Sequence, residues 1–274
     1  MPSRTERWRP AVGGVSIGHF KITAGTLGVL AWRNRERVIV SNNHVLANAN
    51  GGAAGDPVLQ PGSYDNGRPE ADTLARLEAF VPIRFEGTET PDQCPTARRV
   101  AALLNALCGL LGSQTRYRVV DARPRAEPNL VDAAVARPVE AVDPRLLGPE
   151  NLPTVAAPTL AASAELGLPV RKSGRTTGWT EGRIAAVNVT ARVQYGEGKI
   201  ALFEDQVLID QPGFAAGGDS GSAILSDAGE LVGLLFAGSD RQTLFNRIEH
   251  VMQALDLSLA EGADQTRKDG RHGR

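Results

Sequence analysis

The chain has 274 residues, 42% of them hydrophobic and 22% charged, which is the usual balance for a globular protein. Lys and Arg total 30 and Asp and Glu total 31, so the formal net charge of −1 gives no general attraction for nucleic acid or for an anionic membrane. No stretch approaches the roughly 18 apolar residues of a membrane span, and the charged first residues contain no apolar core of signal-peptide length. We therefore expect a cytoplasmic protein with no nucleic-acid or membrane partner.

Short apolar segments separated by glycines and polar turns dominate the chain, and they predict strands. The first two, 25–32 and 36–43, are predicted to pair through the turn at 33–36. Further strands are predicted at 73–85, 182–196, 199–209, 220–226 and 230–238, and helices at about 96–112 and 244–257. The Pro- and Ala-rich segment 138–163 has no clear period and is predicted to connect two antiparallel β units.

The cysteines, Cys94 and Cys108, lie on either side of a segment with helical periodicity. Its apolar residues are Val100, Leu103, Leu104, Leu107 and Leu111. A helical rise of about 1.5 Å per residue would hold the two sulfur atoms too far apart for a disulfide, and two thiols do not complete a zinc site. The sequence thus predicts reduced cysteines, no metal and no cofactor. The apolar face of this helix must be covered, either by the protein's own β unit, which we favour, or by a regulatory protein partner.

The segment AAGGDSGSAIL, residues 215–225, contains a serine, Ser220, among glycines, which is ordinary turn composition. The alternative is an activated nucleophile, which needs a base to take the hydroxyl proton and an acid to orient that base. Two of the histidines do not suit this role, because His272 lies in the basic tail and His250 in the terminal helix. His44 follows an apolar strand and enters a loop, where a rigid scaffold would hold it exposed to substrate, whereas His19 lacks that setting.

Asp132, in NLVDAAVARP, is the candidate acid because an aspartate among small apolar residues is costly to bury without a partner. The alternative is an aspartate at a strand end with its side chain in water. Asp219 adjoins Ser220 and is expected to support the loop rather than to orient His44. Gly218 would let its own amide and that of Ser220 point at one spot and form an oxyanion hole, and Gly221 would allow a sharp turn.

These segments carry a family resemblance. SNNHVLA at 41–47, VDAAVA at 131–136 and GGDSGSAIL at 217–225 resemble the chymotrypsin-like serine proteases, particularly the bacterial HtrA and alpha-lytic protease groups. Residues 171–191, RKSGRTTGWTEGRIAAVNVTA, are similar to the hairpin that opens the second barrel of alpha-lytic protease and the streptogrisins. The resemblance covers about residues 20–90 loosely and 168–257 well. It implies two antiparallel β-barrels with the active site between them.

On such a fold the chain divides as follows: an N-terminal extension at 1–12, a first barrel at 13–140 with a helical insert at about 91–113, a connection at 141–164, a second barrel with a C-terminal helix at 165–257, and a disordered basic tail at 258–274. The resemblance assigns the catalytic roles to His44, Asp132 and Ser220. It also implies a specificity pocket walled by Phe214, Ala215, Ala216, Gly217, Ala237, Gly238 and Ser239. These residues favour a small or apolar side chain before the cleaved bond.

The chain departs from the family pattern at several positions. Arg171 and Glu181 stand where secreted relatives carry a bridging cysteine pair, and we expect an ion pair between them. Phe214 replaces another cysteine, and Phe236 stands where a serine often hydrogen-bonds the catalytic aspartate. Asp132 must then be oriented by other groups, or the alignment slips by a residue.

The sequence therefore predicts a serine endopeptidase that works through a Ser-His-Asp triad and an acyl-enzyme. RPAVGG, residues 9–14, resembles the activation junction of trypsin-type zymogens, but the bond after Arg9 precedes a proline, so we expect no activation by cleavage there. Phe236 and the helical insert leave one alternative open, a catalytically latent protease fold that serves as a binding or regulatory module.

Overall fold

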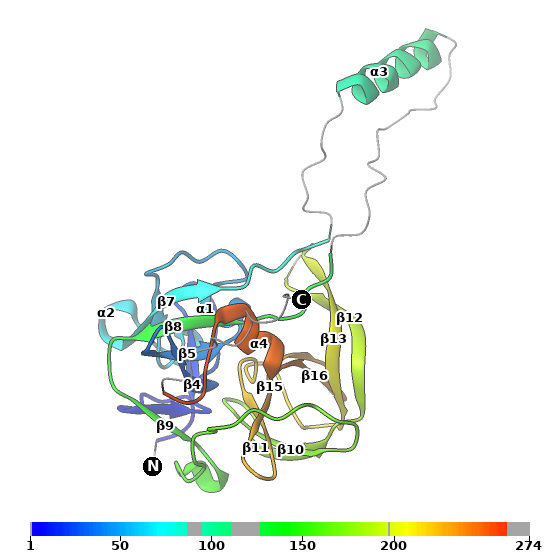
Figure 1. Cartoon of the computed structure of the whole chain (residues 1–274). Coiled ribbons are helices and arrows are strands. Elements are labelled where there is room, and N and C mark those ends of the chain that lie inside the picture. Colours follow the sequence, from blue (N-terminus) through cyan, green and yellow to red (C-terminus); the bar gives the residue numbers. More distant parts are fainter. Residues whose placement is uncertain (1, 87–94, 111–126, 197, 262–274) are drawn as a thin grey trace, which may run out of the picture.

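The computed structural model describes residues 2–86, 95–110, 127–196 and 198–261. The predicted mainly β architecture is confirmed, since two seven-stranded antiparallel sheets lie side by side (Figure 1). The first sheet has the order β3-β2-β6-β7-β8-β5-β4. Its strands are β2 (Ser16–His19), β3 (Gly25–Thr26), β4 (Val29–Arg33), β5 (Glu36–Ser41), β6 (Pro57–Leu59), β7 (Thr73–Phe80) and β8 (Ala134–Pro138).

The second sheet has the order β11-β10-β14-β15-β16-β13-β12. Its strands are β10 (Pro169–Gly174), β11 (Gly178–Arg183), β12 (Ala186–Gln194), β13 (Ile200–Asp210), β14 (Ala223–Ser226), β15 (Leu231–Gly238) and β16 (Gln242–Arg247). Two short strands, β1 (Ala11–Gly13) and β9 (Val142–Leu146), pair in parallel outside both sheets. The described α-helices are α1 (Asn43–Leu46), α2 (Pro69–Asp72), α3 (Pro95–Leu110) and α4 (Ile248–Leu255).

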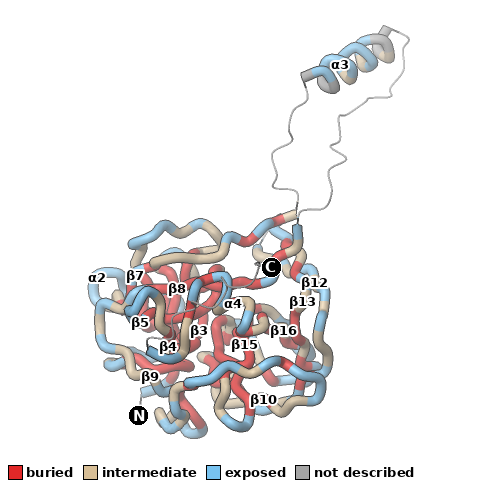
Figure 2. Tube along the Cα trace, in the orientation of Figure 1, coloured by how far each residue is buried: buried red, intermediate tan, exposed pale blue. Residues whose placement is uncertain are grey.

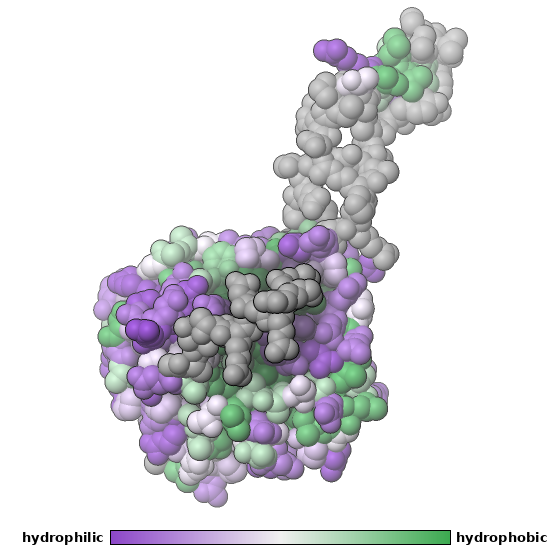
Figure 3. Space-filling view, in the orientation of Figure 1, coloured by the Kyte–Doolittle hydropathy of each residue, from purple (hydrophilic) through white to green (hydrophobic). Residues whose placement is uncertain are grey.

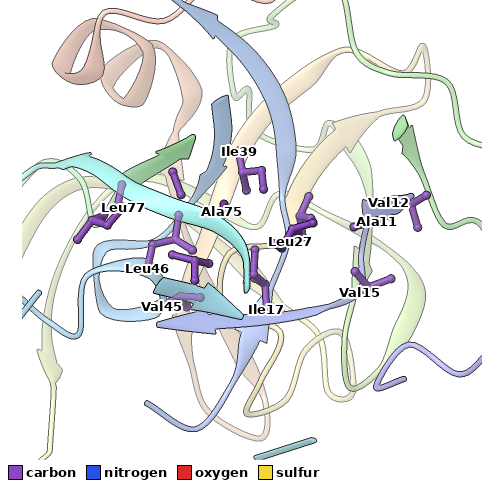
Figure 4. Packing of buried hydrophobic residues seen from close by; sticks show 14 of the residues in the cluster. Ala11, Val12, Val15, Ile17, Leu27, Ile39, Val45, Leu46, Ala75 and Leu77 are labelled. Carbon is purple, nitrogen blue, oxygen red and sulfur yellow. The ribbon is translucent and has the colours of Figure 1, made fainter. Parts of the chain in front are cut away.

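Strand β5 explains how the first sheet serves two cores at once. Val38, Ile39 and Val40 form a continuous apolar run, but successive side chains point to opposite faces of a strand. Ile39 joins the core inside the first sheet, and Val38 and Val40 join the core shared with the second sheet and α4. The inner core also contains Ile17, Leu27, Leu46 and Leu77 (Figure 4). Buried residues run along most strands of both sheets (Figure 2).

The second sheet has its own core, which includes Val207, Phe214 and Phe245. Helix α4 covers the junction of the two sheets, where Val251 and Leu255 pack among residues of both. The two sheets therefore pack against each other at this junction. The candidate site residues lie in the segments at the ends of their strands.

The predicted helix at 244–257 is wrong at its start. Residues Gln242–Arg247 form strand β16, which pairs with both β13 and β15, and the helix covers only Ile248–Leu255. Because β16 pairs on both edges, its backbone N–H and C=O groups form their hydrogen bonds within the sheet and do not need a helix to satisfy them. Strand formation thus prevailed over the apolar periodicity of the segment.

The predicted helix of the insert is present as α3, but the expectation that its apolar face packs on the barrel is wrong for its described residues. Val100 is 51% and Leu103 63% exposed. Figure 3 shows hydrophobic residues gathered on this helix. Cys108 has a free thiol, while Cys94 and most of the predicted basic tail (262–274) lie outside the described residues.

The N-terminal segment is fixed to the body of the protein by Arg4, whose side chain is buried. The Arg4 guanidinium donates to the Ser173 hydroxyl (2.6 Å) and to the carbonyl oxygens of Gly14 (3.1 Å) and Gly148 (3.0 Å). Arg4 Nε donates to the Asn151 side chain at 2.7 Å. One side chain therefore connects the turn before β2, the connecting segment and strand β10 of the second sheet.

Replacing Arg4 with Ala should lower the free energy of unfolding by about 3 kcal/mol, because several buried acceptors lose their donor together. Urea unfolding at pH 7, followed by tryptophan fluorescence, measures the change. Arg7→Ala is the control: the Arg7 side chain is 52% exposed, and its ion pair with Asp72 should contribute at most about 1 kcal/mol. Equal losses in the two variants would contradict the assigned role of Arg4.

Candidate active site

His44 lies in helix α1, which follows strand β5 directly. Its ring is about a quarter exposed, and Nδ1 is 2.5 Å from Oδ2 of Asp132. The backbone amide of His44 also donates to Oδ1 of Asp132 at 3.2 Å. The carboxylate therefore fixes the direction of the imidazole, and Nε2 is the ring nitrogen left for another partner.

Asp132 precedes strand β8 and is completely buried, so the alternative of a strand-end aspartate in water is wrong. Its main chain is held on both sides, because its amide donates to Asn246 Oδ1 (3.0 Å) and its carbonyl accepts from Asn42 Nδ2 (2.8 Å). Asn246 is oriented in turn by donation to Gln206 at 2.7 Å. These bonds fix the position of the residue, whereas the bonds from His44 compensate the carboxylate itself, since desolvation disfavours its charge.

A further partner of Asp132 comes from a residue that the sequence did not single out. The hydroxyl of Tyr195 donates to Oδ2 of Asp132 at 2.8 Å. Tyr195 directly follows β12, where a tyrosine after an alternating strand gives no signal of a distant carboxylate. Phe236 makes no such bond; it packs in an apolar cluster with Phe203. The signal that could have led to Tyr195 is the missing serine at Phe236, which leaves the buried carboxylate one donor short.

Ser220 lies in the turn before strand β14. This turn contacts the first sheet, because Thr26 donates its amide to the Ser220 carbonyl (2.8 Å) and its hydroxyl to the Gly218 carbonyl (2.9 Å). Gly28 permits this approach: a Cβ there would lie 2.5 Å from the Gly221 carbonyl oxygen. Gly218 and Gly221 have φ angles of +96° and +93°, which side chains disfavour.

The amides of Gly218 and Ser220 have no hydrogen-bond acceptor within the described part of the chain. Their neighbour Asp219 has the opposite character, because its carboxylate accepts from the amides of Thr176 (2.7 Å) and Ala216 (3.0 Å). Asp219 therefore supports the loop, as expected, and its carboxylate bonds are to residues other than His44.

Lys172, on strand β10, is completely buried, and its ammonium lies 3.7 Å from the Asp219 carboxylate. It also donates to the Gly178 carbonyl at 3.0 Å. Burial lowers the pKa of Lys172 from 10.5 to about 8, against the opposing attraction of Asp219. This lysine could not be identified from the sequence, because a single lysine in a strand gives no sign that it is buried.

His44 and Ser220 line one cavity of about 970 Å³, together with residues 189–196 of the β12 region. Six of the predicted pocket residues line it as well: Ala215, Ala216, Gly217, Ala237, Gly238 and Ser239. Phe214 does not, and its prediction as a pocket wall is wrong, because its side chain is completely buried in the core of the second sheet. Asp240 is the acidic residue of the lining.

The other histidines are placed away from this cavity or lie outside the described residues. His19 is completely buried and lies 3.0 Å from Asp56, so it has a structural partner of its own. His250 contacts Asp205 at 2.7 Å, and His272 is not among the described residues. The expected ion pair between Arg171 and Glu181 is also wrong: these residues face each other across β10 and β11, but Arg171 pairs with Asp227 instead.

The fold is similar to that of bacterial serine proteases of known structure. Thermobifida fusca protease A matches with a TM-score of 0.57 at 18% identity, over 92% of this chain and 99% of that chain. Nocardiopsis protease (NAPase) matches with a TM-score of 0.54 at 17% identity, over 90% and 97%. Alpha-lytic protease homolog N4 matches with a TM-score of 0.53 at 19% identity, over 91% and 99%. The fold is the chymotrypsin-like double barrel.

The model of peptidase family S64 matches residues 116–257, just over half of the chain. The chain belongs to this family, and with its double-barrel fold it is a serine protease that acts on proteins or peptides. The matched region includes Asp132 and Ser220, whereas His44 lies before it. No helix within the described residues has the length and hydropathy of a membrane span.

The buried Lys172 should make the free energy of unfolding depend on pH in the alkaline range. Between about pH 8 and 10.5 the unfolded chain keeps the Lys172 proton while the folded protein releases it, so the contribution of this residue to the free energy of unfolding rises with pH. In Lys172→Met that rise should be missing, whatever the baseline stability of the variant. Urea unfolding of both proteins from pH 7 to 10.5 measures the difference, and parallel curves would contradict the assignment.

Proposed function

We propose that Ser220, His44 and Asp132 are the catalytic triad of a serine endopeptidase. The observation that carries this proposal is the shared cavity: it contains Ser220 and His44, and the buried Asp132 carboxylate holds the far side of the His44 ring at 2.5 Å. Three residues that are remote in sequence thus gather at one cavity, which supports the roles of nucleophile, base and orienting acid for Ser220, His44 and Asp132.

The chemistry follows from these positions. His44 Nε2 takes the proton of the Ser220 hydroxyl while the Ser220 oxygen forms a bond to the scissile carbonyl carbon. The π electron pair of the C=O bond moves to the carbonyl oxygen of the substrate. When that pair returns, the C–N bond breaks, His44 gives the proton to the departing amine, and an acyl-enzyme remains. A water molecule then repeats both steps and releases the carboxylic acid, with Asp132 stabilising the imidazolium in each half.

The amides of Gly218 and Ser220 are proposed as the oxyanion hole. Support comes from their lack of an acceptor within the described residues and from the positive φ of Gly218. Asp219, neutralised by Lys172 inside the same chain, would hold this loop without help from a newly cut amino terminus. We therefore retain the expectation that cleavage after Arg9 is not needed for activity.

The substrate cavity supports a preference for a small or apolar residue before the cleaved bond. Ala215, Ala216 and Ala237 bring only methyl groups to the lining, and Val189 and Leu235 add further apolar surface. The cytoplasmic location and the regulatory partner at the insert stay predictions; the exposed Val100 and Leu103 favour a partner over packing on the barrel. No described contact specifically favours the latent binding module.

A fluorophosphonate probe tests the triad directly. We expect the purified protein to be labelled at Ser220, with the label lost in Ser220→Ala and reduced by at least about a thousandfold in rate in His44→Ala. His250→Ala is the matched control, because His250 lies away from the cavity and should leave labelling unchanged. Mass spectrometry locates the label. An unlabelled but folded wild-type protein would contradict the proposal and favour the latent module.

A peptide library tests the specificity. Cleavage should be concentrated after small or apolar residues, with Arg and Lys disfavoured, because the described lining has one acidic group, Asp240, and also contains the cation Arg192. The comparison is kcat/KM for matched peptides that differ only at the residue before the cut. A dominant preference for Arg or Lys would show that Asp240 reaches that side chain.

A further inference from the structure

Tyr195 makes a contact to which neither the sequence nor the proposed mechanism has given a role. Its hydroxyl donates to Oδ2 of Asp132 at 2.8 Å, and the same oxygen lies 2.5 Å from Nδ1 of His44. The Tyr195 ring also stands edge-on to the His44 ring, with 5.7 Å between centroids and an interplanar angle of 68°. One side chain of the second sheet therefore contacts both residues that come from the first.

An aromatic cluster fixes the Tyr195 ring in this position. Its centroid is 5.7 Å from that of Phe85 and 6.2 Å from that of Phe203, and Phe203 packs on Phe236 at 4.7 Å. At the backbone, the Tyr195 amide donates to the Lys199 carbonyl at 2.8 Å and closes the turn between β12 and β13. Ring and main chain are both held, so the hydroxyl is aimed before substrate arrives.

The electrostatics keep Tyr195 a donor. Burial, the charge of Asp132 and the hydrogen bond to it together raise the pKa of Tyr195 well above 10. Within the described residues, His44 and Tyr195 are the titratable groups that touch the Asp132 carboxylate, and Asn42 and Asn246 bind only its main chain. The phenol therefore stays protonated wherever His44 works as a base.

Tyr195 also directly follows β12, whose residues form one wall of the cavity. Residues 189–195 all line it, so an extended substrate lying along β12 would press on the segment that carries the phenol. The position of the hydroxyl is thus coupled through a short stretch of backbone to the place where substrate binds.

We propose that Tyr195 is a positioning residue of this protease: from the substrate-binding strand, its hydroxyl holds the Asp132 carboxylate so that Oδ2 faces Nδ1 of His44. It takes the part of the hydroxyl that is missing at Phe236. This inference rests on the proposed function, because it assumes that His44 and Asp132 serve Ser220. It predicts that the phenol contributes to the chemical step, beyond its share in compensating the buried carboxylate, and that it does not contribute to substrate affinity.

Tyr195→Phe removes only the hydroxyl and tests this role. We expect kcat to fall about tenfold with KM nearly unchanged, which is the size of effect typical of one hydrogen bond to a charged group. The acidic limb of the kcat/KM profile should move to higher pH, because a carboxylate that has lost a donor attracts the imidazolium more strongly. Tyr64→Phe is the matched control, since Tyr64 is 71% exposed and not part of the cavity lining.

A second readout does not require turnover. In the Ser220→Ala background, the NMR resonance of the proton between His44 Nδ1 and Asp132 should shift when Tyr195 becomes Phe and stay in place when Tyr64 does. A purely structural Tyr195 would lower the melting temperature but move neither this resonance nor the pH profile, and that result would overturn the inference.

The two proposals fail in different ways. A wild-type protein that a fluorophosphonate does not label overturns the proposed function. A wild-type protein that is labelled at Ser220, with Tyr195→Phe labelled at the same rate and with the same pH profile, overturns only the role of Tyr195.

Discussion

The burial of the Asp132 charge is the constraint on which the arrangement of the two barrels depends. A carboxylate without any exposure is tolerated only when hydrogen bonds replace its water. Here the donors come from both barrels, with His44 on the first and Tyr195 on the second, while Asn246 of the second holds the main chain. Separating the barrels would remove Tyr195 from the carboxylate and Asn246 from its main chain, so the docking of the barrels and the geometry of the candidate site depend on the same contacts.

A second buried charge, that of Asp219, holds the Ser220 loop in place, as the Asp132 carboxylate holds the His44 ring. Lys172 neutralises it from strand β10, and the turn after that strand donates the amide of Thr176. Arg4 fixes the same strand through the Ser173 hydroxyl. The sequence resemblance implies that secreted relatives bridge this hairpin with cysteines; in this chain, polar contacts hold the corresponding region. Two buried carboxylates thus support the candidate site, each compensated by residues remote in the sequence.

The sequence predicted what depends on short motifs and missed what depends on tertiary contact. Glycines next to Ser220 and a histidine after an apolar strand mark turns whose geometry is local, so the order of the site residues was visible. Tyr195 and Lys172 owe their roles to side chains far along the chain, and nothing near them reveals it. Phe214 was misplaced for the same reason: a large residue beside a pocket can point into the cavity or into the core, and the core of the second barrel accepted it.

The contacts around Asp132 also help to distinguish an active protease from a latent binding module. A buried ionic network is a weak source of stability, and apolar side chains of similar volume often stabilise a fold as well or better. A module that only binds a partner would gain nothing from holding this carboxylate, its amide supports and a phenol. All of these groups converge on one nitrogen of His44, while the other ring nitrogen remains for the cavity that contains Ser220. Apolar contacts could join the barrels equally well, whereas the convergence on His44 serves proton transfer, which favours catalysis as the reason for the network.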